Sequence, residues 1–157
     1  MRLYHGTSEK HLEEIKKDGY LYKPYLTNEP NDAVMWSRKT VEMGSDLRGK
    51  FADDKPVVLI LEVDDEYIRK NCQMDDILLL ERFVVPVPEN DREEFGDCPE
   101  EYWSFAPEDA RDYWEKVLEE RGEEPIDWAL TNIQSIVCDI GNARIPAEAI
   151  VEVYRED

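Results

Sequence analysis

Apolar and polar residues follow a helical period in some segments of the chain and a strand-like pattern in others. The clearest helix begins at Pro107 and ends at Gly122, with apolar side chains at i, i+3, i+4, i+7 and i+8 between Ala110 and Leu118. The clearest strand is 57–63, whose continuous apolar run predicts burial on both faces. Both types of element are therefore expected in one chain.

Weaker signals cover most of the remaining sequence. Thr7 or Ser8 would cap a helix that ends at Gly19, and Asn28 with Pro30 would open a second helix. Further expected elements are strands at 2–5, 20–27, 78–87, 135–140 and 150–154, a short helix at 126–133 and a surface loop at 43–55. We therefore predict an α+β fold in a single domain over residues 1–157.

Acidic residues outnumber basic ones two to one, with 38 Asp and Glu against 19 Lys and Arg and a formal net charge of -19. Residues 1–55 hold ten of each, whereas 89–127 holds sixteen acidic and four basic residues. Such a charge argues against general binding to duplex nucleic acid, because phosphate contacts need Lys and Arg. We interpret 89–127 as an acidic loop-and-helix insertion, which is either a solvated face or a surface for a basic partner.

The cysteines and histidines suggest neither a disulfide framework nor a metal site. Cys72, Cys98 and Cys138 form no Cys-x-x-Cys pair and no even set, so we interpret them as free thiols. His5 and His11 share no helical face, which disfavours zinc. The apolar runs are too short to cross a bilayer and the first residues lack the apolar core of a signal peptide, so we expect a cytoplasmic protein without membrane contact.

The first segment with chemical potential is Leu-Tyr-His-Gly-Thr-Ser at residues 3–8. It places His5 at a strand end, Gly6 where a ligand could approach the backbone, and the hydroxyl of Thr7 beside them. Such a turn can hydrogen-bond a ribose or an amide. Taken alone, a strand-end histidine before a helix cap is more often a structural arrangement.

Two further segments carry aromatic and carboxylate side chains. Tyr25 ends a strand and Trp36 lies on the next helix, so together they could form two walls of a slot for a flat ring. The run from Gln134 to Ile150 holds Asp139 and closes with Ile-Pro-Ala-Glu-Ala-Ile. Each of these patterns by itself is usually core packing.

Taken in order, the segments resemble the ADP-ribosyltransferase superfamily, and specifically its His-Tyr-Glu branch, which includes poly(ADP-ribose) polymerases and diphtheria-type toxins. The resemblance covers about half of the chain. It lies in the opening at 3–8, the helix exit at 15–19, Tyr-Leu-Thr at 25–27, the strand at 57–64 and the closing Ile-Pro-x-Glu-x-Ile. It implies an ADP-ribosyltransferase-like split of short β-strands with flanking helices.

The resemblance also implies a function, that of a mono-ADP-ribosyltransferase that cleaves the nicotinamide–ribose bond of NAD and transfers ADP-ribose to a macromolecular acceptor. His5 would bind ribose hydroxyls of NAD, Gly6 would offer its backbone to the nicotinamide amide, and Tyr25 would stack on the nicotinamide ring. Thr7 and Trp36 would complete the NAD-binding set. Aromatic faces suit this ring because it is planar and cationic.

The third catalytic position departs from the family pattern. The family places an acid there, which bonds the ribose 2′-hydroxyl and stabilises an oxocarbenium-like centre, but no Glu lies between Asp127 and Glu148. Asp139 is our candidate, and Gln134 is the alternative, although its amide supplies no negative charge. If neither reaches the cleft, the protein binds NAD or ADP-ribose without transferring it.

Two other functions stay open at this point. RNA 2′-phosphotransferases share the Tyr-His-Gly-Thr opening, but their basic second motif is missing here. The non-enzymatic alternative is an acidic interaction protein, an inhibitor or nucleic-acid mimic that occupies the basic groove of a partner. For the enzyme, a basic protein is a better acceptor or partner than nucleic acid because of the negative charge.

Overall fold

The computed structural model describes residues 1–46 and 53–156, which form two compact units. Unit 1 takes the described residues of Met1–Gln73 and Ile136–Asp157, and unit 2 takes Met74–Ser135. The acidic segment 89–127 therefore lies within a unit that begins before it and ends after it. The fold is α+β, as the hydrophobic pattern predicts.

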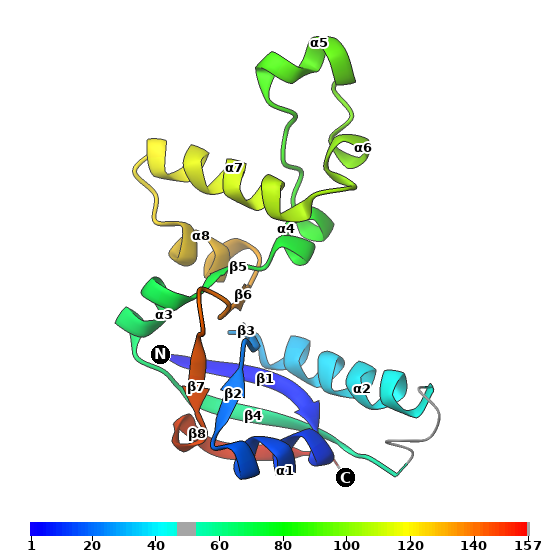
Figure 1. Cartoon of the computed structure of the whole chain (residues 1–157), viewed down its shortest axis with the longest axis vertical. Helices are drawn as coiled ribbons and strands as arrows, with labels where there is room; N and C mark the ends of the chain where they lie inside the picture. The colour runs from blue at the N-terminus through cyan, green and yellow to red at the C-terminus, as the bar shows by residue number, and fades with distance from the viewer. Residues whose placement is uncertain (47–52, 157) are drawn as a thin grey trace. The chain divides into compact units, whose positions relative to one another are not determined.

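Unit 1 is built on an antiparallel sheet (Figure 1). Strand β1 (Arg2–Ser8) pairs along its whole length with β4 (Pro56–Glu62), and β4 pairs on its other side with β8 (Ile150–Arg155). The strands predicted at 57–63 and 150–154 are confirmed, whereas the strand predicted at 2–5 continues to Ser8, so His5 lies within it and not at its end. Val57, Leu59 and Leu61 share one face of β4 and are buried, whereas on the opposite face Ile60 is half-buried and Glu62 is exposed, so the predicted burial on both faces is wrong from Ile60 onward.

The other edge of β1 meets β3 (Tyr25–Thr27) at one register pair, Tyr4↔Thr27. The sheet order is β5-β6-β3-β1-β4-β8, and the chain passes from unit 1 to unit 2 within β5 (Gln73–Met74) and returns within β6 (Ser135–Val137). Strands β2 (Tyr20–Tyr22) and β7 (Arg144–Pro146) form a separate ladder. The predicted strand at 135–140 is thus shorter than expected.

The helices of unit 1 follow their capping signals. Helix α1 (Glu9–Asp18) begins after Ser8, whose hydroxyl accepts a hydrogen bond from the His11 amide, and it ends at Gly19, whose φ is 85°. Helix α2 (Pro30–Asp46) begins directly after Glu29, whose carboxylate accepts from the Asn31 amide, so Glu29 and not the predicted Asn28 caps this helix. Helix α3 (Asp65–Asn71) and the 3₁₀ turn η2 (Ala147–Ala149) complete the unit.

The predicted loop at 43–55 is only partly described. Helix α2 extends into it as far as Asp46, and residues 47–52 lie outside the described residues.

The regular structure of unit 2 is helical, except that its first residue, Met74, belongs to β5 and its last, Ser135, belongs to β6. Its helices are α4 (Asp76–Arg82), η1 (Glu89–Asp91), α5 (Arg92–Phe95), α6 (Pro99–Trp103), α7 (Pro107–Glu120) and α8 (Pro125–Asn132). Trp114 of α7 is buried, and its ring centroid lies 4.9 Å from that of Phe83 and 5.6 Å from that of Trp128. The predicted aromatic core of this helix is confirmed.

The strand predicted at 78–87 is wrong, because its first half is helix α4. The carboxylate of Asp75 accepts a hydrogen bond from the Leu78 amide at 3.1 Å and caps this helix. A run of leucines is compatible with a helix as well as with a buried strand, and the cap decides in favour of the helix.

The prediction of three free thiols is wrong for two of them. Cys72 and Cys138 form a disulfide, with their Cα atoms 4.0 Å apart, whereas Cys98 is free and exposed. Spacing in the sequence does not reveal this pair because the fold alone brings the end of α3 beside the segment that follows β6.

Within the described part of the chain, no helix combines the length and the apolar character needed to cross a membrane.

Candidate functional site

A cavity of about 500 Å³ lies within unit 1, and its walls come from β1, α1, the β2–β3 segment and α2. Its volume falls in the range typical of small-molecule sites. Strands β1 and β3 share only the pair Tyr4↔Thr27, and the cavity is lined by the residues of β1 that follow this pair. It brings together four residues of the predicted NAD-binding set: His5, Gly6, Thr7 and Tyr25.

His5 and Tyr25 are joined directly by a hydrogen bond. Nδ1 of His5 lies 2.7 Å from the carbonyl oxygen of Tyr25. A carbonyl can only accept, so Nδ1 carries the proton and donates it, which leaves Nε2 of the neutral ring as an acceptor. Tyr25 itself is 50% exposed.

The charge state of His5 suits an acceptor. Burial lowers the pKa of His5; the hydrogen bond to Tyr25 opposes this shift and the nearby His11 adds to it, so that the pKa lies below the ordinary value of 6.5. The imidazole is therefore neutral at neutral pH.

Ser8, His11 and Asp54 form a hydrogen-bonded group beside the cavity. Ser8 Oγ lies 3.0 Å from His11 Nδ1, and Asp54 accepts from the Lys10 amide at 3.0 Å. Burial would raise the pKa of Asp54, but hydrogen bonds from Ser8 and from two backbone amides outweigh it and lower the pKa. Ser8 is fully buried, so this group fixes the start of α1 and is not a nucleophilic triad.

Gly6 has a packing role that the sequence did not reveal. A Cβ atom at this position would lie 2.1 Å from the carbonyl oxygen of Ala33 and 2.7 Å from the amide nitrogen of Ser37. The backbone of α2 therefore occupies the space into which a side chain at position 6 would project, so a ligand cannot approach Gly6 from that direction. A glycine is required here so that α2 can contact β1.

The other predicted site residues lie elsewhere. Among the described residues, the cavity lining includes neither Trp36 nor Asp139. Trp36 lies on α2 with Lys39 Nζ 4.9 Å from its ring centroid. Gln134 belongs to unit 2, where it follows α8 with a φ of 64°. Its backbone N–H donates a hydrogen bond to the Ala129 carbonyl.

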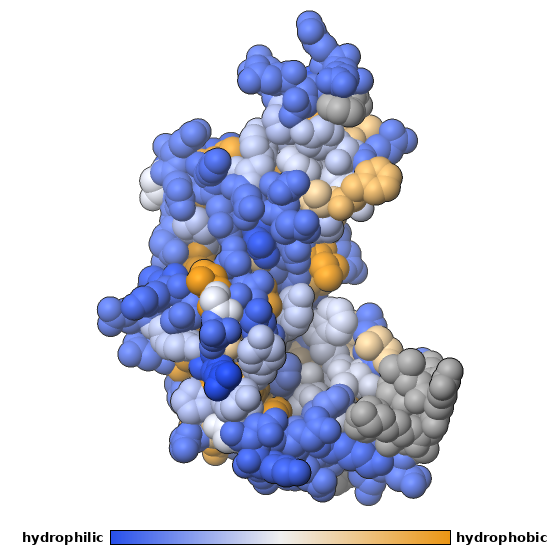
Figure 2. Space-filling model, viewed as in Figure 1, coloured by the Kyte–Doolittle hydropathy of each residue, from blue (hydrophilic) through white to orange (hydrophobic). Residues whose placement is uncertain are grey.

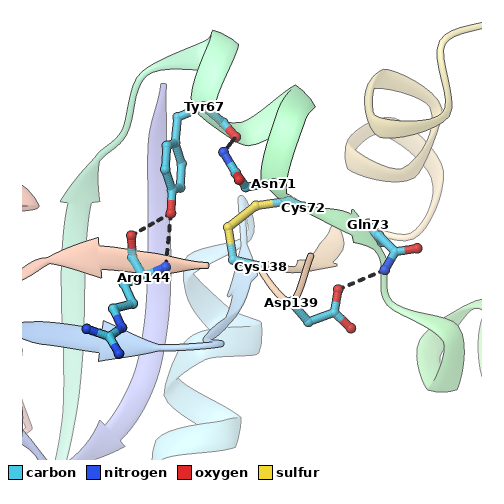
Figure 3. Close-up of a disulfide and its surroundings, with 7 residues drawn as sticks. All are labelled: Tyr67, Asn71, Cys72, Gln73, Cys138, Asp139 and Arg144. Carbon is cyan, nitrogen blue, oxygen red and sulfur yellow. Dashed lines mark hydrogen bonds between the residues drawn. A yellow bond between two sulfur atoms is a disulfide. The ribbon is translucent and has the colours of Figure 1, made fainter. Parts of the chain in front are cut away.

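Asp139 is held beside the disulfide (Figure 3). Its Oδ1 accepts a hydrogen bond of 2.9 Å from Nε2 of Gln73, the residue after Cys72. The amide of Cys138 donates to the carbonyl of Pro24, the residue before Tyr25. The disulfide segment is therefore connected through the backbone to the strand that carries Tyr25.

Three cavity residues on α1 were missed by the sequence interpretation. His11, Glu14 and Asp18 all line the cavity, and their spacing of i, i+3 and i+7 places them on one face of the helix. This spacing is visible in the sequence, but only the fold shows that the face borders His5. Over the described ranges, no group of His, Cys, Asp and Glu side chains could hold a metal ion.

The cavity thus offers a hydrogen-bond acceptor at His5 Nε2, the half-exposed aromatic residue Tyr25, and the carboxylates of Glu14 and Asp18. These groups could bind a ligand with hydroxyls and a flat cationic ring. Comparison of the chain with protein-family models, with curated proteins and with solved structures found no match.

Proposed function

We propose that this protein is a mono-ADP-ribosyltransferase that binds NAD in the cavity of unit 1. The single observation that carries the proposal is that His5 and Tyr25, chosen from the sequence for one ligand, line the same cavity and are hydrogen-bonded to each other. Strands β1 and β3 share the register pair Tyr4↔Thr27 beside this cavity, and this short pairing supports an ADP-ribosyltransferase-like arrangement of short strands. The acceptor of ADP-ribose is a macromolecule.

His5 and Tyr25 hold the nicotinamide half of NAD in this proposal. Nε2 of His5 accepts a hydrogen bond from a ribose hydroxyl, and the Tyr25 ring stacks on the cationic nicotinamide. Nicotinamide leaves with the electron pair of its bond to C1′, and an acceptor atom then bonds to C1′ and loses its proton. A nearby carboxylate stabilises the positive charge that develops at C1′.

The first test is whether NAD stabilises the protein. A ligand that binds only the native state at about 100 times its Kd adds roughly 2.7 kcal/mol to the free energy of unfolding, so millimolar NAD should raise Tm. His5→Ala and Tyr25→Ala should each lose this rise and the release of nicotinamide. Tyr154→Ala is the matched control, because Tyr154 has a similar exposed fraction of 47% and lies on β8, away from the cavity lining.

Circular dichroism must show that the three variants stay folded. Near-normal nicotinamide release in both His5→Ala and Tyr25→Ala would contradict the proposal.

A second test locates the catalytic carboxylate. Asp139→Asn and Gln134→Ala examine the two positions that the family resemblance suggests, and Glu14→Gln examines a carboxylate that lines the cavity. The neighbouring Glu13→Gln is the control on the same helix. Loss of nicotinamide release with retained NAD binding would identify the residue that stabilises C1′.

The non-enzymatic alternative is favoured by one observation, the charge of unit 2. Its sequence holds 19 acidic and five basic residues, a net of -14. An acidic interaction protein would show no change in Tm with NAD, together with tight and salt-sensitive binding to a basic partner.

A further inference from the structure

Unit 2 contains a second cavity, of about 570 Å³, formed by the end of α4, the segment after it, α6 and the start of α7. Its lining is mainly apolar and includes Leu80, Phe83, Val85 and Trp103. Nε1 of the buried Trp103 donates a hydrogen bond of 3.0 Å to the Val85 carbonyl, so the indole already has its polar partner. The cavity is preformed.

One apolar residue of the cavity lining, and a second that follows a lining residue in the sequence, are exposed to solvent. Val84, which lines it, is 73% exposed, and Phe105, which lies between the lining residues Ser104 and Pro107, is 95% exposed. Single exposed apolar residues are ordinary, but two of them beside an apolar cavity form a candidate contact surface. Figure 2 shows hydrophobic surface next to strongly hydrophilic surface on this part of the chain.

The surroundings of this cavity are acidic. Glu100 lines it, and Glu81, Glu101 and Glu108 are exposed and each directly follows a lining residue in the sequence. Two of the five basic residues of unit 2 donate to carbonyl groups inside the unit: Arg82 to Ile133 and Arg92 to Val87. The net charge of -14 therefore attracts cations and repels anions.

We propose that this cavity is the docking site for a basic amphipathic segment of a partner protein. The segment inserts a large apolar side chain beside Val84 and Phe105 and places Lys or Arg against the acidic rim. A purely basic chain would leave the apolar cavity unused, and a second copy of this protein would bring another strongly negative surface. The proposal does not rest on NAD binding, because the cavity for NAD lies in unit 1.

The probe for the test is a synthetic amphipathic helical peptide of Leu and Lys, added to the full chain. Cys98 reports binding at the cavity, because it lines the cavity as the exposed free thiol while Cys72 and Cys138 are joined. We expect the peptide to slow the alkylation of Cys98 by a maleimide about tenfold, which corresponds to occupancy of roughly nine sites in ten. A Lys-only peptide of equal charge and a Leu–Glu peptide should give little protection.

Variants separate the apolar contact from the general charge. Val84→Ser and Phe105→Ser should each weaken binding of the Leu–Lys peptide by about tenfold or more, as expected for an anchoring contact. Ile77→Ser is the control, because Ile77 is also an exposed apolar residue of unit 2, at 57%, but neither lines the cavity nor lies between two lining residues in the sequence, as Phe105 does. Both exposed positions tolerate serine without loss of the fold, which circular dichroism checks.

Several results would overturn the proposal. Unchanged peptide affinity in Val84→Ser and Phe105→Ser would remove the cavity from the interaction, and equal affinity for the Lys-only peptide would leave only charge. Equal binding of the Leu–Glu peptide would show that the acidic residues around the cavity do not contribute to binding. A dimer in sedimentation that Phe105→Ser dissociates would assign the cavity to a second copy of this chain.

Discussion

Neighbouring residues of the candidate site differ in how far the sequence explains them. His5 and Tyr25 line one cavity because β1 pairs with β3, although His5 lies in the middle of β1 and not at the predicted strand end. The role of Gly6 depends on α2, which arrives from another part of the chain. Trp36 and Asp139 were assigned by segment order, and their placement outside the cavity lining depends on tertiary packing that segment order does not contain.

A titration of His5 tests the electrostatics of the site. Burial disfavours the charged ring, so the folded protein should show a pKa below 6.5 at this residue. Because the folded pKa is lower than the unfolded one, the contribution of His5 to the free energy of unfolding is present above pH 6.5 and is lost as the pH falls through the folded pKa. Nitrogen NMR of the imidazole measures both the pKa and the tautomer.

The lowered pKa of His5 also predicts how NAD binding depends on pH. Protonation of Nε2 removes the acceptor for the ribose hydroxyl, so the NAD-dependent rise in Tm should persist down to about pH 6.5 and decline only below it. A pKa at or above the ordinary value would contradict the lowering by burial, and a proton on Nε2 in place of Nδ1 would contradict the hydrogen bond to Tyr25.

At the scale of elements, the sequence predicted best where a periodic pattern and its end signals agree. Helix α7 has an apolar stripe, a proline at its start and Gly122 after its end, and helix α1 has Ser8 and Gly19. Helix α4 was mistaken for a strand because its apolar run is only a few residues long. Strand β7 was missed because three residues give no measurable period.

The disulfide between Cys72 and Cys138 predicts a loss of stability on reduction. It joins residues 66 positions apart, and closing a loop of that length lowers the entropy of the unfolded chain by an amount worth about 4 kcal/mol. A thiol reductant, or the double change Cys72→Ala and Cys138→Ala, should therefore lower the denaturation midpoint in urea.

Cys98→Ala is the matched control for that experiment, because Cys98 is exposed and unpaired with another cysteine. It should leave the midpoint unchanged. An oxidised protein whose thiol titration gives three free thiols would show that the bond does not form.

The bond also holds the segment next to Pro24, so reduction should weaken NAD binding more than Cys98→Ala does.

At the scale of the whole molecule, the negative charge is divided unequally between the two units. The sequence of unit 2 carries a net charge of -14, whereas that of unit 1 holds 19 acidic and 14 basic residues, a net of -5. An anionic dinucleotide such as NAD would therefore meet less repulsion from unit 1, which contains its proposed cavity. The strongly acidic unit is the one with the proposed surface for a basic partner.

This division predicts that unit 1 folds and binds NAD without unit 2. Cys72 and Cys138 lie before and after unit 2 in the sequence with their Cα atoms 4.0 Å apart, so a short Gly-Ser linker in place of Met74–Ser135 can join the cut ends. All residues that line the NAD cavity lie outside the excised segment, so the rise in Tm with NAD should persist, while the Leu–Lys peptide should no longer change Tm because its cavity is removed. Circular dichroism and thermal melts check both expectations. A unit that is a domain has its own core and can fold alone, so an excised chain that does not fold would contradict this prediction.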